Sequence, residues 1–267
     1  MKKLLDEIKN AGFKTDKGGF VLFGEYPQSL KTKDVTVSTE TDARGYFLGS
    51  DGCYYAKLTA KPRIGKYKFT SGEVICSGKE YFFKVEPIIW KAIDARDGMA
   101  LLLCKNVIDV KRFDEKTKVY ANSELRTWLE GEFFGIAFDA GEKEKIATVV
   151  LEDGNEKTNK NEAPKEDKVF PLSFSEIAKR LPYGNEHYMR KASDYTRASG
   201  IQMLIPGGIV RDVGANYGNG DWWLRSPYRY DTRPLVERVD SWGNAGGSNW
   251  VDNTYTGVTP ALWIKIN

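Results

Sequence analysis

Short runs of strand-forming residues occupy residues 20–90 of this chain and limit the folds it can adopt. Glycine, proline and aspartate interrupt these runs, as expected for strands joined by tight turns. Two nearly continuous apolar runs, at 88–93 and 99–104, flank the turn Asp97-Gly98 and predict neighbouring central strands. The other strands predicted in this region span residues 20–23, 46–48, 54–57, 66–69 and 80–85.

Helical segments are few and do not alternate regularly with the strands. An amphipathic helix is predicted within residues 1–13, and further helices at 122–134, 141–147 and 173–181. The last of these begins with an S-x-x-E capping box. Strands that outnumber helices without β-α alternation indicate an α+β fold. Because no internal repeat is visible, we expect a single domain over residues 1–267.

Two regions depart from this regular pattern. Residues 152–168 contain no large apolar residue and predict a solvated, mobile loop. Residues 207–257 hold nine glycines and four of the seven tryptophans, a composition typical of loops and bulges. A final strand is expected at 257–264. We expect Trp222, Trp223 and Trp263 to lie in the core.

Charge and cysteine content exclude several classes of protein. The chain carries 40 basic and 37 acidic residues, so the basic surplus of a nucleic-acid-binding domain is missing. No apolar run approaches the roughly 20 residues that span a bilayer, and the first residues are too charged for a signal peptide. The odd set Cys53, Cys76 and Cys104 lacks C-x-x-C spacing and predicts reduced thiols. We therefore expect no nucleic-acid partner, no membrane insertion, no signal peptide and synthesis in a bacterial or phage cytoplasm.

The sequence also lacks the common catalytic and phosphate-binding motifs. His187 is the only histidine, which removes most zinc sites and makes any serine-histidine hydrolase depend on this one residue, and its polar, turn-like surroundings indicate a surface position. Asp221 precedes two tryptophans, and we expect it to have a structural role with Arg225 as its partner. No catalytic residue, metal or cofactor is predicted.

The segment 228–256 has the composition of a binding surface. Aromatic residues give large contact area at low entropic cost, and small polar residues adapt to a ligand. Val239-Asp240, Gly243, Val251 and Gly257 are expected to form a framework, whereas Trp242 and Trp250 fit packing and display equally well. The candidate ligand-binding residues are Tyr228, Arg229, Tyr230, Asp231, Arg233, Ser241, Trp242, Asn244, Ser248, Asn249, Trp250, Asp252, Asn253 and Tyr255.

Six motifs in a fixed order resemble a bacterial family of uncharacterised domains. In this chain they are F-G-E-Y-P-Q at 23–28, V-E-P-I-I-W at 85–90, L-R-T-W-L at 125–129, F-P-L-S-F-S-E at 170–176, D-W-W-L-R-S-P at 221–227 and G-V-T-P-A-L-W at 257–263. The resemblance covers about residues 20–266. The chain departs from the family pattern at Pro171, inside an F-L-L-S element, and at Thr259, where the family has arginine.

The resemblance implies a C-type-lectin fold of the formylglycine-generating-enzyme type. The enzyme branch uses a pair of C-terminal cysteines that bind copper, and here every cysteine precedes residue 105. Members linked to diversity-generating retroelements instead vary a C-terminal stretch that contacts a ligand. By this resemblance, residues 228–256 form a variable ligand-binding region.

The function expected from the sequence is that of a non-enzymatic display protein of phage or bacterial origin. Its partner is expected to be a protein or a cell-surface ligand, and it can also associate with a virion. Two alternatives stay open: an enzyme of formylglycine-generating or hydrolase type that uses Asp221 and another acid, or a structural module of a surface assembly that docks through residues 1–13. The oligomeric state stays open as well.

Overall fold

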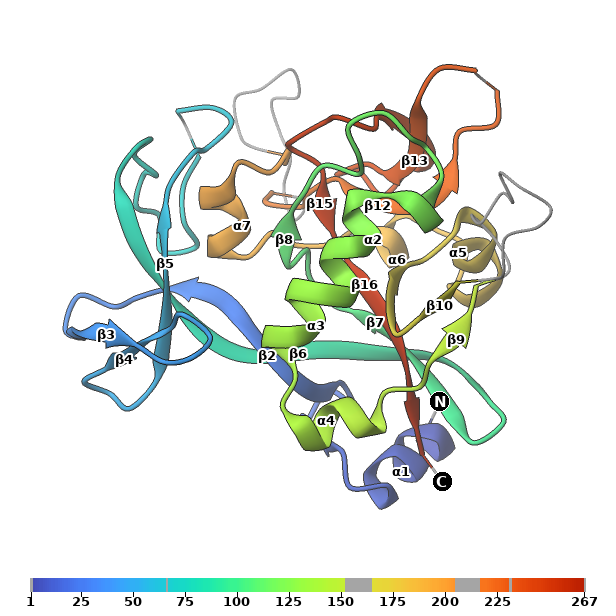
Figure 1. The fold of residues 1–267 in the computed structure, drawn as a ribbon, viewed down its shortest axis with the longest axis horizontal. Coiled ribbons are helices and arrows are strands. Elements are labelled where there is room, and N and C mark those ends of the chain that lie inside the picture. The colour runs from blue at the N-terminus through green and yellow to red at the C-terminus, as the bar shows by residue number, and fades with distance from the viewer. Residues whose placement is uncertain (1, 66, 152–164, 205–216, 231, 267) are drawn as a thin grey trace.

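A computed structural model of the chain describes residues 2–65, 67–151, 165–204, 217–230 and 232–266 (Figure 1). In the view of Figure 1 the N and C marks both lie at the bottom of the molecule. The helices are α1 (Lys2–Asn10), α2 (Glu124–Trp128), α3 (Phe134–Ala137), α4 (Ala140–Lys145), α5 (Phe174–Arg180), α6 (Asn185–Tyr188) and α7 (Asp194–Ser199). None of the helices in these ranges is long and apolar enough to cross a membrane.

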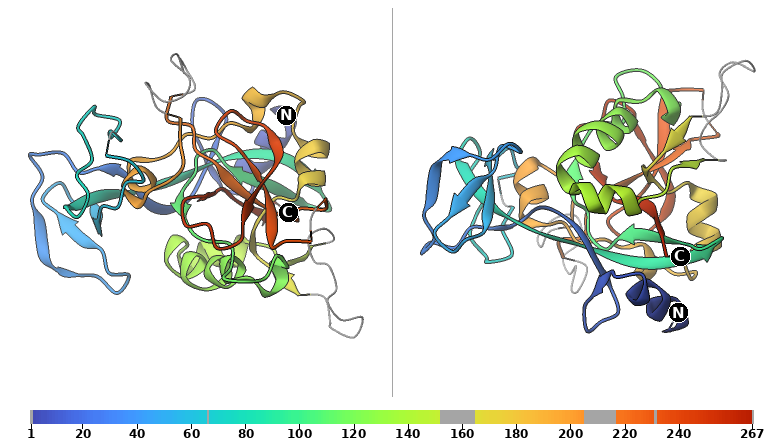
Figure 2. Two further views of the ribbon diagram at one scale, coloured as in Figure 1. Left: turned by 90° about the horizontal axis from the view of Figure 1, so that it is seen from above. Right: turned by 60° about the horizontal axis from the view of Figure 1, so that its bottom comes forward.

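The larger sheet has the order β11-β16-β7-β6-β5-β4-β3, with β2 on β6 and β1 on β2. Its longest strand, β6, pairs with β5 along its first residues, with β2 along its middle and with β7 along its last. Figure 2 shows β3 to β5 projecting from the rest of the molecule. The strands are β1 (Lys14–Thr15), β2 (Val21–Leu30), β3 (Val37–Thr41), β4 (Phe47–Gly49), β5 (Tyr54–Thr59), β6 (Glu80–Arg96), β7 (Met99–Cys104), β11 (Val169–Pro171) and β16 (Pro260–Lys265).

The smaller sheet has the order β14-β13-β12-β15-β8, and β12 runs parallel to β15. Its strands are β8 (Asp109–Val110), β12 (Trp222–Pro227), β13 (Leu235–Val239), β14 (Ala245–Trp250) and β15 (Gly257–Val258). Strands β9 (Val149–Val150) and β10 (Glu166–Asp167) form a separate two-stranded antiparallel sheet. Sheets and few helices without regular alternation confirm the predicted α+β class.

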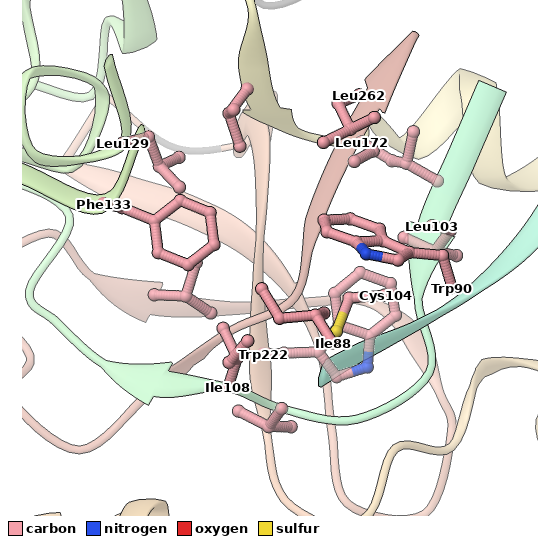
Figure 3. Packing of buried hydrophobic residues seen from close by; sticks show 14 of the residues in the cluster. Ile88, Trp90, Leu103, Cys104, Ile108, Leu129, Phe133, Leu172, Trp222 and Leu262 are labelled. Carbon is pink, nitrogen blue, oxygen red and sulfur yellow. The ribbon is translucent and has the colours of Figure 1, made fainter. Parts of the chain in front are cut away.

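The core lies between the two sheets and the α2–α3 segment (Figure 3). Trp90 and Trp222 are fully buried beside Leu103, Cys104 and Leu262. The Trp90 indole donates to the carbonyl oxygen of Phe23 at 2.7 Å, so its one polar group is satisfied. Trp222, Trp223 and Trp263 are all buried, as predicted.

Several of the predicted helices and strands are confirmed. The Ser173 hydroxyl and the Glu176 carboxylate form the predicted capping box at the start of α5. The α1 and α4 helices and strand β7 also match their predictions. The helix predicted at 122–134 continues to Ala137, because a π-turn (Leu129–Phe133) carries the chain from α2 into α3 and buries Leu129 and Phe133.

Other predictions fail where tertiary contacts decide the outcome. The strands predicted at 80–85 and 88–93 are one strand, since Pro87 pairs with Glu25 at an irregularity of β2 and tolerates its missing N–H there. The run at 66–69 makes only the isolated bridge Lys68–Val74, and Lys66 lies outside the described residues. Strands β13 and β14 were not predicted. Of the loop predicted at 152–168, residues 152–164 lie outside the described residues.

Candidate functional site

The smaller sheet provides a buried base for residues 228–256, which we call the C-terminal surface. Every residue of β12 is buried, and the indole N–H of Trp223 donates to the carbonyl oxygen of Lys111 at 2.9 Å. Val239 and Val251, both predicted as framework, are also buried. Gly243 has a φ of 81° and lies against the backbone of Asn185, so a side chain there would collide with it. These contacts fix the positions of the loops.

Asp221 anchors the turn after β13. Its carboxylate forms an ion pair with the Arg238 guanidinium, 2.9 Å away, and accepts a hydrogen bond from the backbone N–H of Ser241 at 2.8 Å. Burial raises the pKa of Asp221 above its ordinary value, because removal from water disfavours the charged form. The structural role fits the prediction, but the predicted partner is wrong: Arg225 points to α5, where it pairs with Glu176 and donates to the carbonyl oxygen of Pro171.

The candidate residues divide by exposure. Tyr230 is 87% exposed and Trp250 is 47% exposed. Asp231 lies outside the described residues. The other exposed candidates are Arg229, Arg233, Asn244 and Asp252, and those of intermediate burial are Tyr228, Trp242, Ser248, Asn249 and Tyr255.

Two candidates were wrongly expected to be exposed. Ser241 is buried because its N–H is bonded to Asp221 beneath the turn. Asn253 is buried because its side-chain oxygen accepts from the N–H of Tyr255 at 2.9 Å and from the hydroxyl of Thr256 at 3.1 Å. The Asn249 amide joins this network by donating to Thr256 at 2.7 Å. These side chains shape the turn.

Four of the candidates come together as a cluster. The rings of Tyr228 and Tyr230 meet edge to face with centroids 5.7 Å apart, and the Arg233 guanidinium lies 5.5 Å from the ring centroid of Trp250. The backbone connects the two pairs. The N–H of Tyr228 donates to the carbonyl oxygen of Leu235, and Leu235 is paired with Trp250 on the neighbouring strand. We call Tyr228, Tyr230, Arg233 and Trp250 the aromatic-arginine cluster.

Two further candidates, Tyr255 and Asn244, contact other parts of the chain. The Arg63 guanidinium covers the Tyr255 ring at 3.8 Å. The Asn244 amide donates to the carboxylate of Asp240 and its oxygen accepts from Asn185, so both ends of this side chain are occupied. The structure therefore brings four of the predicted residues together and shows that Tyr255 and Asn244 contact other segments.

Possible catalytic and metal-binding groups were also located. The His187 side chain is 36% exposed on α6, with its Nε2 atom 3.5 Å from Glu186. In the part of the chain that the structure describes, no group of three or more His, Cys, Asp or Glu side chains could hold a metal ion. Cys104 is fully buried, and burial raises the pKa of its thiol to about 12.

A cleft of about 700 Å³ was missed by sequence reasoning. One wall comes from β2 and β6, and the other from residues 191–197 of the later chain. Its polar lining includes Lys191, Asp194 and Arg197. No local pattern signals this cleft, because its two walls are separated by about a hundred residues of sequence.

The fold and surface define the protein as a mixed α+β domain with an exposed aromatic-arginine cluster at its C-terminal end. The chain belongs to the family described as Domain of unknown function (DUF6273), whose sequence profile matches residues 97–266. Comparisons with curated proteins and with solved structures gave no match. Strands β1 to β6, which complete the larger sheet, precede the matched region.

Proposed function

We propose that this protein is a non-enzymatic binding protein that contacts a protein or a cell-surface ligand through its C-terminal surface. The observation that carries the proposal is the aromatic-arginine cluster, which lies exposed beside a strand whose residues are all buried. Tyrosine, tryptophan and arginine are the residue types that dominate binding energy at protein interfaces. A buried framework lets such side chains be replaced without unfolding the domain.

The finer form of the proposal is a C-type-lectin scaffold of the formylglycine-generating-enzyme type that serves as the variable protein of a diversity-generating retroelement. The ordered motifs support it, together with a curled sheet and a second, loop-rich sheet that carries residues 221–258. The framework residues Val239, Gly243, Val251 and Gly257 are buried, while Tyr230, Arg233 and Trp250 of the cluster are exposed. Such a division is what a diversified surface needs.

Binding is tested with arrays of purified bacterial surface proteins and glycans. Wild type is compared with the double variant Tyr230→Ala/Trp250→Ala and with the control Tyr183→Ala, which removes a 98% exposed tyrosine outside the cluster. We expect the double variant to lose at least about tenfold in affinity and the control to bind like wild type. Equal binding by all three proteins would contradict the proposal.

The variable-protein form has its own test. Sequencing this gene across its source population gives the number of substitutions at each codon. We expect changes to concentrate at exposed positions of 228–256 and to avoid the buried Val239, Ser241 and Val251. If codons 228–256 are as constant as the rest of the gene, the diversification proposal is wrong, and a single fixed ligand is then the better explanation of the surface.

A further inference from the structure

We propose that the cleft between β2, β6 and α7 binds a small organic carboxylate with an apolar body, held by the guanidinium of Arg197. The cleft measures about 700 Å³, within the range of small-molecule sites. It shares no residue with the C-terminal surface, so it is a second binding site with its own ligand chemistry. We call it the Arg197 cleft.

Arg197 is a buried cation without an acidic partner. It is only 4% exposed, and among the described residues it forms no ion pair. Its Nε donates to the carbonyl oxygen of Ala192 at 3.1 Å and its Nη1 to that of Lys68 at 2.9 Å. A guanidinium has five N–H donors, so three have no hydrogen bond within the described part of the chain. A buried charge without a counter-charge is costly, and a bound anion would offset that cost.

The nearest carboxylate on the same helix is occupied. Asp194 accepts from the backbone N–H and the hydroxyl of Thr70 at 2.6 and 2.8 Å, and from the N–H of Leu30 at 3.2 Å. These bonds tie α7 to the opposite wall of the cleft. Asp194 therefore builds the cleft and leaves the Arg197 guanidinium to an incoming group.

A glycine packs closely against the guanidinium. Gly218 has a φ of 80°, and a Cβ atom there would lie 2.5 Å from the Nη2 atom of Arg197. The Tyr217 ring, 5.7 Å from the guanidinium carbon, forms the neighbouring wall. Since Nε and Nη1 point to backbone oxygens of the wall, Nη2 and the second Nη1 proton are the donors left for a ligand.

A second cation lies at the same end of the cleft. Lys191 is exposed, and its Nζ donates to the carbonyl oxygen of Tyr217 at 2.6 Å. Partial removal of its ammonium group from water, and then the positive charge of Arg197, lower the pKa of Lys191. Lys191 therefore adds to the positive charge that Arg197 brings to the cleft.

The rest of the lining selects among anions. Leu22, Pro87 and Ile89 give the cleft an apolar floor that suits a hydrocarbon body. Glu86 and Asp194 also line it, so a doubly charged phosphate would meet two carboxylates, whereas a singly charged carboxylate meets less repulsion. Guanidinium and carboxylate are geometrically matched for paired hydrogen bonds. A monocarboxylate with an aromatic or aliphatic body fits all of these features.

The test uses benzoate and hexanoate as probes, with benzamide, hexanamide and inorganic phosphate as comparisons. Binding to the full chain is followed by calorimetry and by the rise in melting temperature. We expect saturable binding of the carboxylates and little or none of the amides or phosphate. If neither carboxylate binds, or if an amide or phosphate binds equally well, the proposal is overturned.

Three variants locate the site. Arg197→Gln removes the charge and is expected to lower carboxylate affinity at least about tenfold, as for loss of a charge-assisted hydrogen bond. Because Arg197 also bonds to the wall, Asn106→Asp provides a second variant that keeps the guanidinium and adds a negative charge to the cleft lining with almost no change in shape. Asn10→Asp, on exposed α1, is the matched control. Weaker binding in Asn106→Asp but not in Asn10→Asp supports the site even if Arg197→Gln fails to fold, and unchanged binding in Asn106→Asp overturns it.

Discussion

The C-terminal surface and the Arg197 cleft use similar residue types in opposite ways. On the C-terminal surface, aromatic and charged side chains stand exposed on a sheet built largely from one stretch, residues 221–258. In the Arg197 cleft, Asp194 and Arg197 are buried and bonded to both walls. The surface can therefore change its chemistry at small cost in stability, whereas the cleft residues hold the fold and the site together.

The largest expected difference is between two tryptophans of the same sheet. Trp223 is fully buried against Phe113, and its indole N–H is bonded to Lys111. Trp223→Ala is expected to lower the free energy of unfolding by about 3–5 kcal/mol, because it leaves a cavity and an unsatisfied carbonyl. Trp250→Ala removes a half-exposed ring and is expected to cost about 1 kcal/mol or less. Urea denaturation measures both, and similar losses would remove the distinction between framework and display.

Two aspartates compare the regions directly. Asp194→Ala in the cleft leaves the N–H groups of Thr70 and Leu30 without their acceptor, and we expect a loss of about 2–4 kcal/mol. Asp252→Ala on the exposed C-terminal surface is expected to change stability by less than about 0.5 kcal/mol. Thermal and urea unfolding give the two values. A small effect at Asp194 would mean that water replaces the carboxylate and that the cleft wall is not held as described.

Local patterns predicted the elements whose stabilising contacts are close in sequence. The capping box of α5 joins Ser173 to Glu176, three residues apart, and β7 is a run of apolar residues in the core. By contrast, the passage of β6 through Pro87 depends on an irregularity in β2, about sixty residues earlier. Strands β13 and β14 were missed because β13 becomes a strand by pairing with buried β12, and the short, glycine-containing β14 by pairing in turn with β13.

The same limit explains what sequence could say about the two sites. The C-terminal surface was found because its residues lie in one segment with a distinctive composition. Exposure within that segment was not predictable, since Ser241 and Asn253 are buried by hydrogen bonds to Asp221 and Thr256. The cleft was not predictable at all, because Arg197 becomes a buried cation only when α7 packs on the β2–β6 ribbon.

A buried carboxyl outside both regions tests the effect of burial by pH. Burial raises the pKa of Asp167 to about 6, although the Arg126 guanidinium lies 2.7 Å away. The folded protein therefore binds this proton more tightly than the unfolded chain, whose aspartate has the ordinary value of 3.8. The stability from this group is complete below the unfolded value and is lost as the pH rises to about 6.

Asp167→Asn isolates that contribution. The melting temperature of Asp167→Asn minus that of wild type is expected to increase by a few degrees as the pH rises from about 4 to 6.5, because the amide does not ionise. Asp252→Asn, an exposed aspartate, is the control and should follow wild type. A constant difference between Asp167→Asn and wild type across this range would show that Asp167 is already ionised at low pH and that Arg126 outweighs the effect of burial.

The smallest expected effect is at the centre of the aromatic-arginine cluster. Tyr230 is 87% exposed and touches the Tyr228 ring by its edge, so Tyr230→Ala should change the free energy of unfolding by less than about 0.5 kcal/mol. Tyr183→Ala, at 98% exposure, sets the baseline for removing a tyrosine from water. If Tyr230→Ala is clearly more destabilising than Tyr183→Ala, the ring stabilises the loop before β13 and cannot vary freely. Equal values would leave Tyr230 available for a ligand, since its side chain then contributes nothing that the fold requires.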